Sequence, residues 1–182
     1  MSSSNFTDYL RHNEQFADNG GMREVPEIPF IPFKQVYLIT CLDPRVEPSA
    51  VLGTKLGEAI IARNIGGRVT PSVINDLAWI CYLHENKTPD ADWFEVAIMH
   101  HTDCGSSLFA DDDLRRGYAA IGGYDERTAA AMAVLDPAKS VREDIALLNS
   151  APELAAGRGR FRIGGYAYDV KTGRVTTVVD PS

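Results

Sequence analysis

The stretch VYLITCLDPR, residues 36–45, decides the fold class, because an unbroken apolar run leads directly into polar and ionisable side chains. Residues 59–62 and 96–99 form two further β-prone runs of the same kind. Continuous apolarity, unlike an alternating pattern, is typical of strands that are buried on both faces of a parallel sheet. The sequence therefore predicts an α/β fold with a mainly parallel central β-sheet.

A crossover helix is expected between the second and the third of these strands. Thr70 has the character of an N-cap, and Pro71 stands at the first helical position, which proline favours. The residues that follow place an apolar stripe at helical spacing, formed by Val73, Leu77 and Ile80. Such a helix can connect two parallel strands.

A second helix and a final pair of strands complete the predicted elements. Ser140 and Glu143 have the spacing of a capping box at the start of the helix, and Pro152 ends it. The two last strands are expected on either side of Thr172 and Gly173. Strands that alternate with helices predict a sheet that helices flank on both sides.

The chain is expected to consist of an N-terminal arm and one domain. Residues 1–33 contain an amphipathic piece over 6–16, and three prolines follow it at Pro26, Pro29 and Pro32. This composition predicts a short helix and then an extended arm. Residues 34–182 are predicted to form one α/β domain, because a chain of 182 residues can bury a self-sufficient core.

Charge and hydropathy narrow the classes of partner. Lys and Arg total 18 and Asp and Glu total 25, and the net charge of -7 repels phosphate backbones and anionic membrane surfaces. No apolar run approaches the roughly 20 residues that cross a bilayer. The acidic, polar start of the chain does not resemble a secretory signal. We therefore expect a cytoplasmic protein without nucleic-acid or membrane partners, whose three cysteines are ligands, nucleophiles or core residues rather than disulfides.

Three functional side chains follow the first buried strand. Pro44 biases Asp43 toward an extended conformation, in which side chains two residues apart share a face. Cys41, Asp43 and Arg45 are thus expected to point the same way. They come at the carboxyl end of a strand, where open α/β sheets place their ligand sites.

The third buried strand runs into a second group of candidate ligands, which His101 and Cys104 supply. Two thiolates and one imidazole suit zinc, and they leave the fourth tetrahedral position open to water. Each of the two patterns is a weak signal alone. Their occurrence at the ends of separate buried strands favours one zinc ion per chain, held by Cys41, His101 and Cys104.

The succession of Cys-x-Asp-x-Arg and His-x-x-Cys resembles the zinc-binding pattern of the β-class carbonic anhydrases. Further similar stretches lie at residues 56–59, 63–70, 100–105, 141–144 and 168–173. The resemblance implies that Cys41, His101 and Cys104 bind zinc and that Asp43 and Arg45 form a catalytic dyad beside the fourth coordination position. In some members the residue that matches Asp43 binds zinc itself and closes the site, and the sequence leaves both arrangements open.

The resemblance implies reversible hydration of carbon dioxide to bicarbonate by zinc-bound hydroxide, in a homodimer or homotetramer that the N-terminal arm helps to form. Two departures from the family pattern, Pro44 and the run of small residues at 105–107, concern the surroundings of the pocket. They leave open hydrolysis of carbonyl sulfide or carbon disulfide at the same zinc site. A binding module that zinc only stabilises is the alternative from another class. A thiol-redox role lacks a second cysteine in a Cys-x-x-Cys arrangement.

The remaining polar residues have structural interpretations. Cys81 is expected in the core of the crossover helix, and His100 is expected to face away from zinc. Asp103 is expected to orient a neighbouring loop amide. The acidic run at 111–113 is interpreted as a helix start rather than a calcium loop.

Two more features have no predicted ligand. Gly66 and Gly67 follow a strand but lack the full glycine pattern of a dinucleotide-binding loop, so a close approach of two chain segments explains them. His12 and His84 stand in no recognisable context.

Overall fold

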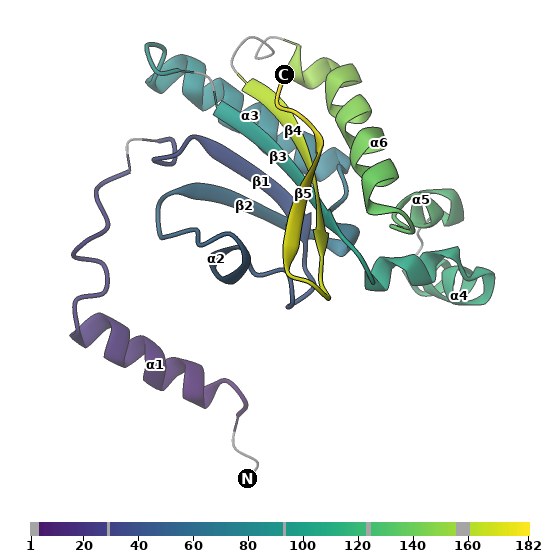
Figure 1. Cartoon of the computed structure of the whole chain (residues 1–182), viewed down its shortest axis with the longest axis horizontal. Coiled ribbons are helices and arrows are strands. Elements are labelled where there is room, and N and C mark those ends of the chain that lie inside the picture. Colours follow the sequence, from purple (N-terminus) through teal and green to yellow (C-terminus); the bar gives the residue numbers. More distant parts are fainter. Residues whose placement is uncertain (1–3, 29, 93, 123–124, 156–160) are drawn as a thin grey trace.

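The computed structural model describes residues 4–28, 30–92, 94–122, 125–155 and 161–182. Within these residues, one sheet contains five strands in the order β2-β1-β3-β4-β5 (Figure 1). Their bounds are Val36–Cys41 for β1, Ala59–Asn64 for β2, Phe94–His101 for β3, Phe161–Asp169 for β4 and Arg174–Val179 for β5. All neighbours are parallel except β4 and β5, which pair antiparallel. The predicted mainly parallel α/β sheet is confirmed, including the final strand pair.

The central strands are buried on both faces, which explains their continuous apolarity. On one face, Ile39 of β1 and Ile98 of β3 belong to the main core cluster. On the other face, Leu38 and Met99 pack in a second cluster. The second face also carries an apolar cavity of about 210 Å³, lined by residues of all five strands together with Leu52 and Thr54.

Helix α3, Pro71–Lys87, starts where the sequence predicts. The side chain of Thr70 accepts a hydrogen bond from the backbone N–H of Val73 at 3.4 Å. Leu77 and Cys81 lie in the main core cluster, which confirms the interpretation of this cysteine as a core residue. Near the end of the helix, the buried His84 contacts the Thr88 hydroxyl and the Asp92 carbonyl at 2.8 and 2.9 Å, so it closes the connection to β3.

Helix α6, Pro137–Ser150, begins earlier than predicted, so the capping box at Ser140 and Glu143 is wrong. The carboxylate of Asp136 accepts hydrogen bonds from the N–H groups of Ala138 and Lys139 at 2.9 and 3.2 Å. Asp136 and Pro137 together supply an N-cap and a proline at the first helical position, which is a complete start signal four residues upstream of the predicted N-cap Ser140. The helix ends before Pro152 as expected.

The other helices are α1, Thr7–Asp18; α2, Pro48–Val51; α4, Asp112–Gly122; and α5, Glu126–Ala131. Short 3₁₀ turns follow β2 at Ile65–Gly67 (η1), β3 at Gly105–Ala110 (η2) and α6 at Pro152–Leu154 (η3). Asp111 caps α4 by accepting hydrogen bonds from two backbone N–H groups, which confirms that the acidic run opens a helix. In the described part of the chain, no helix is long and apolar enough to span a membrane.

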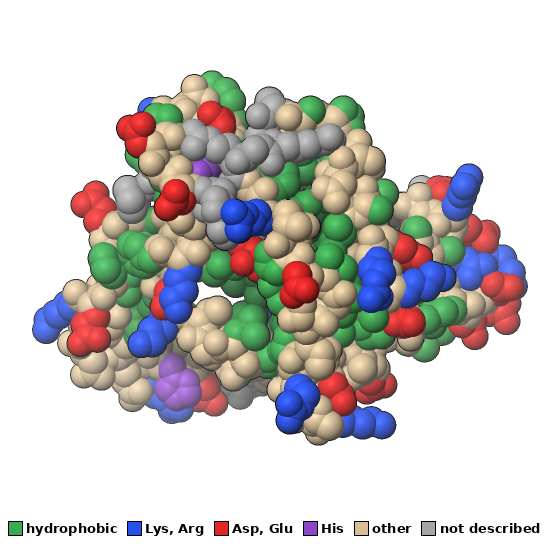
Figure 2. Space-filling view, turned by 45° about the horizontal axis from the view of Figure 1, so that its top comes forward, with side chains coloured by type: hydrophobic (Ala, Val, Ile, Leu, Met, Phe, Trp, Pro, Cys, Tyr) green, Lys and Arg blue, Asp and Glu red, His purple; other side chains and the backbone are tan. Residues whose placement is uncertain are grey.

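The N-terminal helix α1 stands away from the sheet (Figure 1), and none of its residues is buried. Pro29 of the predicted arm lies outside the described residues. The division into an arm over 1–33 and a domain over 34–182 stays a prediction. On the face that Figure 2 shows, basic side chains are interspersed with acidic ones rather than gathered in one basic patch.

Gly67 brings the turn after β2 against the end of β1. Its φ is +67°, and a Cβ atom there would lie 2.6 Å from the carbonyl carbon of Thr40. Only glycine tolerates both that conformation and that distance. The close chain approach predicted for this glycine is therefore present, and it holds η1 beside the strand that ends in Cys41.

Candidate metal centre

Two parallel strands that are neighbours in the sheet bring the candidate ligands together. Cys41 is the last residue of β1 and His101 is the last residue of β3, and Cys104 follows three residues later. The ligand atoms of these three residues all lie within 4.8 Å of one another, and all three side chains are buried. The sulfur atoms of Cys41 and Cys104 are 3.8 Å apart. The geometry thus gathers three ligand types that zinc favours.

The hydrogen bonding of His101 prepares its ring for a metal. The Nδ1 atom lies 2.9 Å from the carbonyl oxygen of Thr102, which can only accept a hydrogen bond. Nδ1 must therefore carry the hydrogen, so that Nε2 has a free lone pair. This Nε2 is buried and has no hydrogen-bond partner among the described residues. A metal ion beside the two sulfur atoms would satisfy it, and the donor set therefore fits zinc.

The two thiols differ in acidity because they share a hydrogen bond. Contact with the Cys41 thiol, helped by His101 and Ser106, lowers the pKa of Cys104 to about 4. The same contact with Cys104, together with burial, raises the pKa of Cys41. Because zinc takes cysteine as the thiolate, metal binding at these residues would have to displace a proton that the two neighbouring sulfur atoms share.

Asp43 and Arg45 form a bidentate ion pair beside the ligands. The guanidinium donates from Nε to Oδ1 at 3.0 Å and from Nη2 to Oδ2 at 2.7 Å. This pairing is the main reason that the pKa of Asp43 is lowered to about 2. Burial opposes the shift, and the backbone N–H of Arg45 supports it with a 2.8 Å hydrogen bond to Oδ1.

The local conformation of this segment differs from the prediction. The N–H of Val46 donates to the carbonyl of Asp43 at 2.9 Å, so the chain turns over residues 43–46 rather than continuing as a strand through Arg45. Asp43 and Arg45 therefore lie in the same turn. The carboxylate of Asp43, at the start of the turn, accepts a hydrogen bond from the backbone N–H of Arg45. The prediction that they share an extended face is wrong, although their side chains do converge.

Asp103 has a different partner from the one expected. Its carboxylate accepts a hydrogen bond from Nη1 of Arg45 at 2.8 Å, and its carbonyl accepts one from Nη2 at 2.9 Å. Its φ of +54° turns the loop between His101 and Cys104 toward the guanidinium. The prediction that Asp103 orients a loop amide is wrong, because it binds Arg45 instead. Arg45 thereby joins the two ligand-bearing loops.

Arg63 is a residue for which the sequence predicts no role, and it holds the first ligand loop. Its Nε donates to the carbonyl of Cys41 at 3.0 Å, and its Nη2 donates to the carbonyl of Asp43 at 2.9 Å. Nη1 pairs with Glu47 at 2.6 Å. Every residue has a backbone carbonyl, so a side chain that binds carbonyl groups has no partner that can be recognised in the sequence. The only indication of a role for Arg63 is its position in the stretch 63–70 that is similar to the family.

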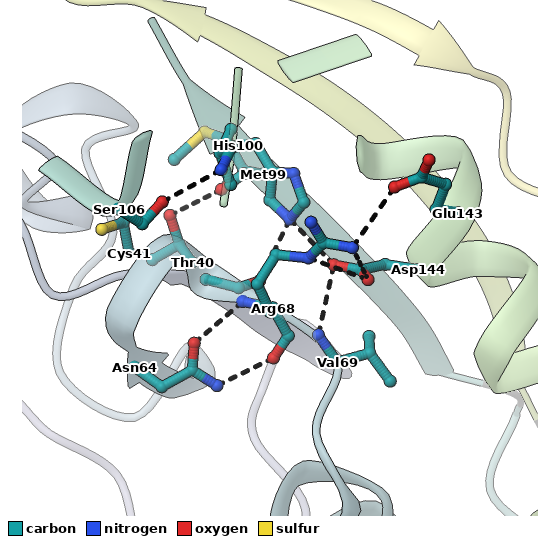
Figure 3. A network of polar contacts seen from close by, with 12 residues as sticks. Thr40, Cys41, Asn64, Arg68, Val69, Met99, His100, Ser106, Glu143 and Asp144 are labelled. Carbon is teal, nitrogen blue, oxygen red and sulfur yellow. Dashed lines mark hydrogen bonds and ion pairs between the residues drawn. The ribbon is translucent and has the colours of Figure 1, made fainter. Parts of the chain in front are cut away.

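His100 lies in a buried polar network behind the ligands (Figure 3). Its Nε2 lies 3.1 Å from both the carbonyl of Gly67 and the carboxylate of Asp144 on α6. Arg68, also buried, binds the other oxygen of Asp144 through Nε at 3.1 Å. His100 is thus a packed histidine, as the sequence interpretation has it.

An apolar pocket of about 280 Å³ adjoins Cys104. Gly105 and Ser106 line it together with side chains from η1, η2 and α4, namely Ile65, Leu108, Phe109, Leu114 and Tyr118. Two of the small residues that depart from the family pattern, Gly105 and Ser106, therefore line this pocket, and they directly follow the candidate ligand Cys104 in the chain.

Comparison with known proteins gives one consistent family. Residues 36–132 match the profile of the family described as carbonic anhydrase. The chain is 30% identical over 171 residues to beta-carbonic anhydrase 1 of Mycobacterium tuberculosis, covering 94% of this chain and 96% of that protein. It is 26% identical over 116 residues to the carbon disulfide hydrolase of Saccharolobus solfataricus, covering 64% and 52%. The crystal structure of carbonic anhydrase from Streptococcus mutans superposes with a TM-score of 0.75 at 34% identity, covering 98% and 99% of the two chains.

Proposed function

The chain belongs to the β-carbonic anhydrase family, and from this premise we propose that it catalyses the reversible hydration of carbon dioxide to bicarbonate and a proton. Cys41, His101 and Cys104 would hold one zinc ion per chain. The observation that carries the proposal is the buried Nε2 of His101, which has no hydrogen-bond partner within the described part of the chain and lies beside two sulfur atoms at the ends of neighbouring strands.

Zinc, when bound, lowers the pKa of a coordinated water to about 7 and so supplies a nucleophile at neutral pH. The role proposed for Asp43 is to accept a hydrogen bond from the water beside the fourth coordination position. Its ionised carboxylate suits this role, because an anion is the stronger acceptor. Arg45 would keep the carboxylate ionised and fixed in orientation through its bidentate contact.

The open arrangement of the site is the one we propose. The candidate ligand group in the described residues comprises the two cysteines and His101, whereas Asp43 is paired with Arg45. Binding of zinc by Asp43 would require this pair to break. Three protein ligands with one position left for water are typical of catalytic zinc, whereas structural zinc has four protein ligands. The arrangement thus favours an enzyme over a zinc-stabilised binding module.

Hydrolysis of carbonyl sulfide to hydrogen sulfide and carbon dioxide is the second candidate, with carbon disulfide as a related substrate. The apolar pocket beside Cys104 favours it, because sulfur is larger and more polarisable than oxygen and needs an apolar wall. The similarity to a carbon disulfide hydrolase points the same way, over about two thirds of this chain.

One preparation of the zinc-loaded protein can decide between these reactions. Stopped-flow measurement with a pH indicator follows hydration of carbon dioxide, and a sulfide assay follows carbonyl sulfide. We expect fast hydration and little sulfide, with both rates lost after chelation and regained with added zinc. Efficient sulfide release with feeble hydration would reverse the ranking. Absence of both activities in a zinc-loaded sample would favour the binding module.

We also propose that the protein works as a homodimer or homotetramer. The support is an exposed apolar face at the start of α1, formed by the N-cap residue Phe6 together with Tyr9 and Leu10 of the helix, with exposed fractions of 60%, 65% and 55%. An apolar helix face that does not pack on its own chain is expected to pack on another molecule.

A further inference from the structure

Ser106 lies against one of the candidate ligands. Its Oγ atom is 3.2 Å from the sulfur of Cys104, and the residue is 5% exposed. The same Oγ lies 3.2 Å from the backbone nitrogen of Val134, in the segment that connects α5 to α6. The small size of this residue is therefore less important than the two contacts of its hydroxyl group.

The direction of these hydrogen bonds follows from their partners. A backbone N–H can only donate, so Val134 donates to a lone pair of the Ser106 oxygen. The hydroxyl hydrogen then remains available for the sulfur. A thiolate that binds a metal can only accept, so the contact with Cys104 has Ser106 as the donor. Both hydrogen-bond directions are thus assigned.

Buried groups hold the hydroxyl in this position. Arg68 donates from Nη1 to the carbonyl of Ala133 at 3.2 Å, next to the N–H that binds Ser106. Asp144 of α6 holds the guanidinium in turn, as Figure 3 shows. Gly66 leaves the necessary room, because a Cβ atom there would lie 3.0 Å from the Ser106 oxygen. The α5–α6 connection and η1 therefore fix Ser106 against Cys104.

We infer that Ser106 is a positioning residue that donates a hydrogen bond to the Cys104 thiolate and thereby sets how strongly this sulfur donates charge to the metal. The inference rests on the proposed zinc site. Two thiolates give a metal more electron density than two imidazoles do, which weakens its action as a Lewis acid. A hydrogen bond draws density away from one sulfur and offsets this effect.

The inference can be tested on the cobalt-substituted protein, because the thiolate-to-cobalt charge-transfer band reports the electron density on sulfur. Ser106→Ala removes the donor, Ser106→Thr keeps a hydroxyl, and Ser107→Ala is a matched control in the same turn. We expect the band of Ser106→Ala to move to lower energy. Its zinc affinity, measured against a chromophoric chelator, should fall roughly tenfold, because the sulfur loses the donor that positions it and that favours the thiolate over the protonated thiol.

The threonine variant should restore both properties, and the Ser107→Ala control should leave them unchanged. An unchanged band in a folded, cobalt-loaded Ser106→Ala protein would overturn the inference, as would equal shifts in the alanine and threonine variants. Either result leaves the proposed function intact if the wild type hydrates carbon dioxide. Failure of the wild type to bind cobalt or zinc would instead overturn the metal site together with the inference.

Discussion

At the scale of single residues, the surroundings of the three cysteines indicate two candidate metal ligands and one core residue. The sulfur atoms of Cys41 and Cys104 lie 3.8 Å apart at strand ends, with the imidazole of His101 beside them. Cys81 packs in the main core cluster on α3, where burial raises the pKa of its thiol to about 11. Within the described residues, the group of side chains that could hold a metal contains Cys41, His101 and Cys104 but not Cys81.

Replacement of the cysteines should reflect this difference. We expect Cys104→Ser to lose zinc and activity together, because a hydroxyl remains protonated at neutral pH and binds zinc weakly. Cys81→Ser should retain about one zinc per chain, with some loss of stability from the buried hydroxyl. Elemental analysis of the purified proteins measures both. Full zinc content in Cys104→Ser would remove this residue from the ligand set.

The dyad should affect turnover more than metal binding. Asp43→Asn replaces an anionic acceptor with an amide whose NH₂ group donates, so we expect zinc to stay bound and hydration to fall on the order of a hundredfold. Arg45→Ala should act in the same direction, because it frees Asp43 and separates the two loops. Zinc content and stopped-flow rates are measured on the same samples. Near-normal rates in zinc-loaded variants would show that the pair is not catalytic.

The titration of Asp43 is expected to depend on Arg45. Its folded pKa of about 2 lies below the ordinary value of 3.8, so folding favours the ionised form. The stabilising contribution is thus complete above pH 3.8 and is lost as the pH falls toward 2. Carbon-13 NMR of the carboxyl group should show ionisation persisting below pH 3.8 in the wild type and a raised pKa in Arg45→Ala, because the guanidinium that lowers it is lost. Equal pKa values in both proteins would contradict the assigned cause.

At the scale of elements, the parallel pairing of β1 with β3 decides where the site lies. Their register sets Thr40 opposite Met99, so Cys41 and His101 come at the same edge of the sheet. The segments that follow are not strands. They are turns that Arg45 and Arg63 hold through side chains and backbone carbonyls. The sheet thus places the ligands, and the arginines fix the loops around them.

The start of α6 offers a test at this scale. Asp136→Ala removes the side chain that caps the helix, and we expect it to lower the free energy of unfolding by about 1 kcal/mol. Glu143→Ala is the matched control from the capping box that the sequence suggests. This substitution removes only the ion pairs of a half-exposed carboxylate with Arg68 and Lys139. The free energy of unfolding should therefore change by less than about 0.5 kcal/mol. Denaturant titration of both variants measures the difference, and a larger effect at Glu143 would restore the original helix start.

At the scale of the whole molecule, α1 is a helix that buries none of its residues against the rest of the described chain. The later part of the arm does contact the body, since Phe33 donates a backbone hydrogen bond to Gly57 at 2.9 Å. None of the residues of α1 itself is buried. The helix is therefore the part of the arm that is available to a second copy.

Loss of the apolar face of α1 should weaken self-association. We expect the double variant Tyr9→Ser, Leu10→Ser to shift the protein toward smaller assemblies, because both side chains are more than half exposed in the single chain. His12→Ser on the same helix is the matched control. Sedimentation velocity over a range of protein concentrations measures the assembly. An unchanged distribution in the double variant would show that α1 does not form the interface.

The sequence by itself determined the features that depend on local pattern and on residue type. Continuous apolar runs identify strands that are buried on both faces, and Thr70-Pro71 marks the start of α3, because both signals lie within a few residues. Each of the two apolar runs is followed directly by polar residues, and this order places Cys41, His101 and Cys104 at or just after strand ends. Zinc chemistry restricts its ligands to few residue types, so these positions could be chosen before the fold was known.

Only the tertiary structure decided which groups meet around these ligands. Arg45 binds Asp103, which lies 58 residues away in the chain, and Ser106 receives the N–H of Val134. Arg68 forms its hydrogen bond with Asp144 because α6 packs against β3 and β4 of the sheet. Periodicity can assign a side chain to a face, but a hydrogen bond forms only within about 3.2 Å and with the right angle. Such distances between remote segments follow from the packing of the whole chain, and no local pattern records them.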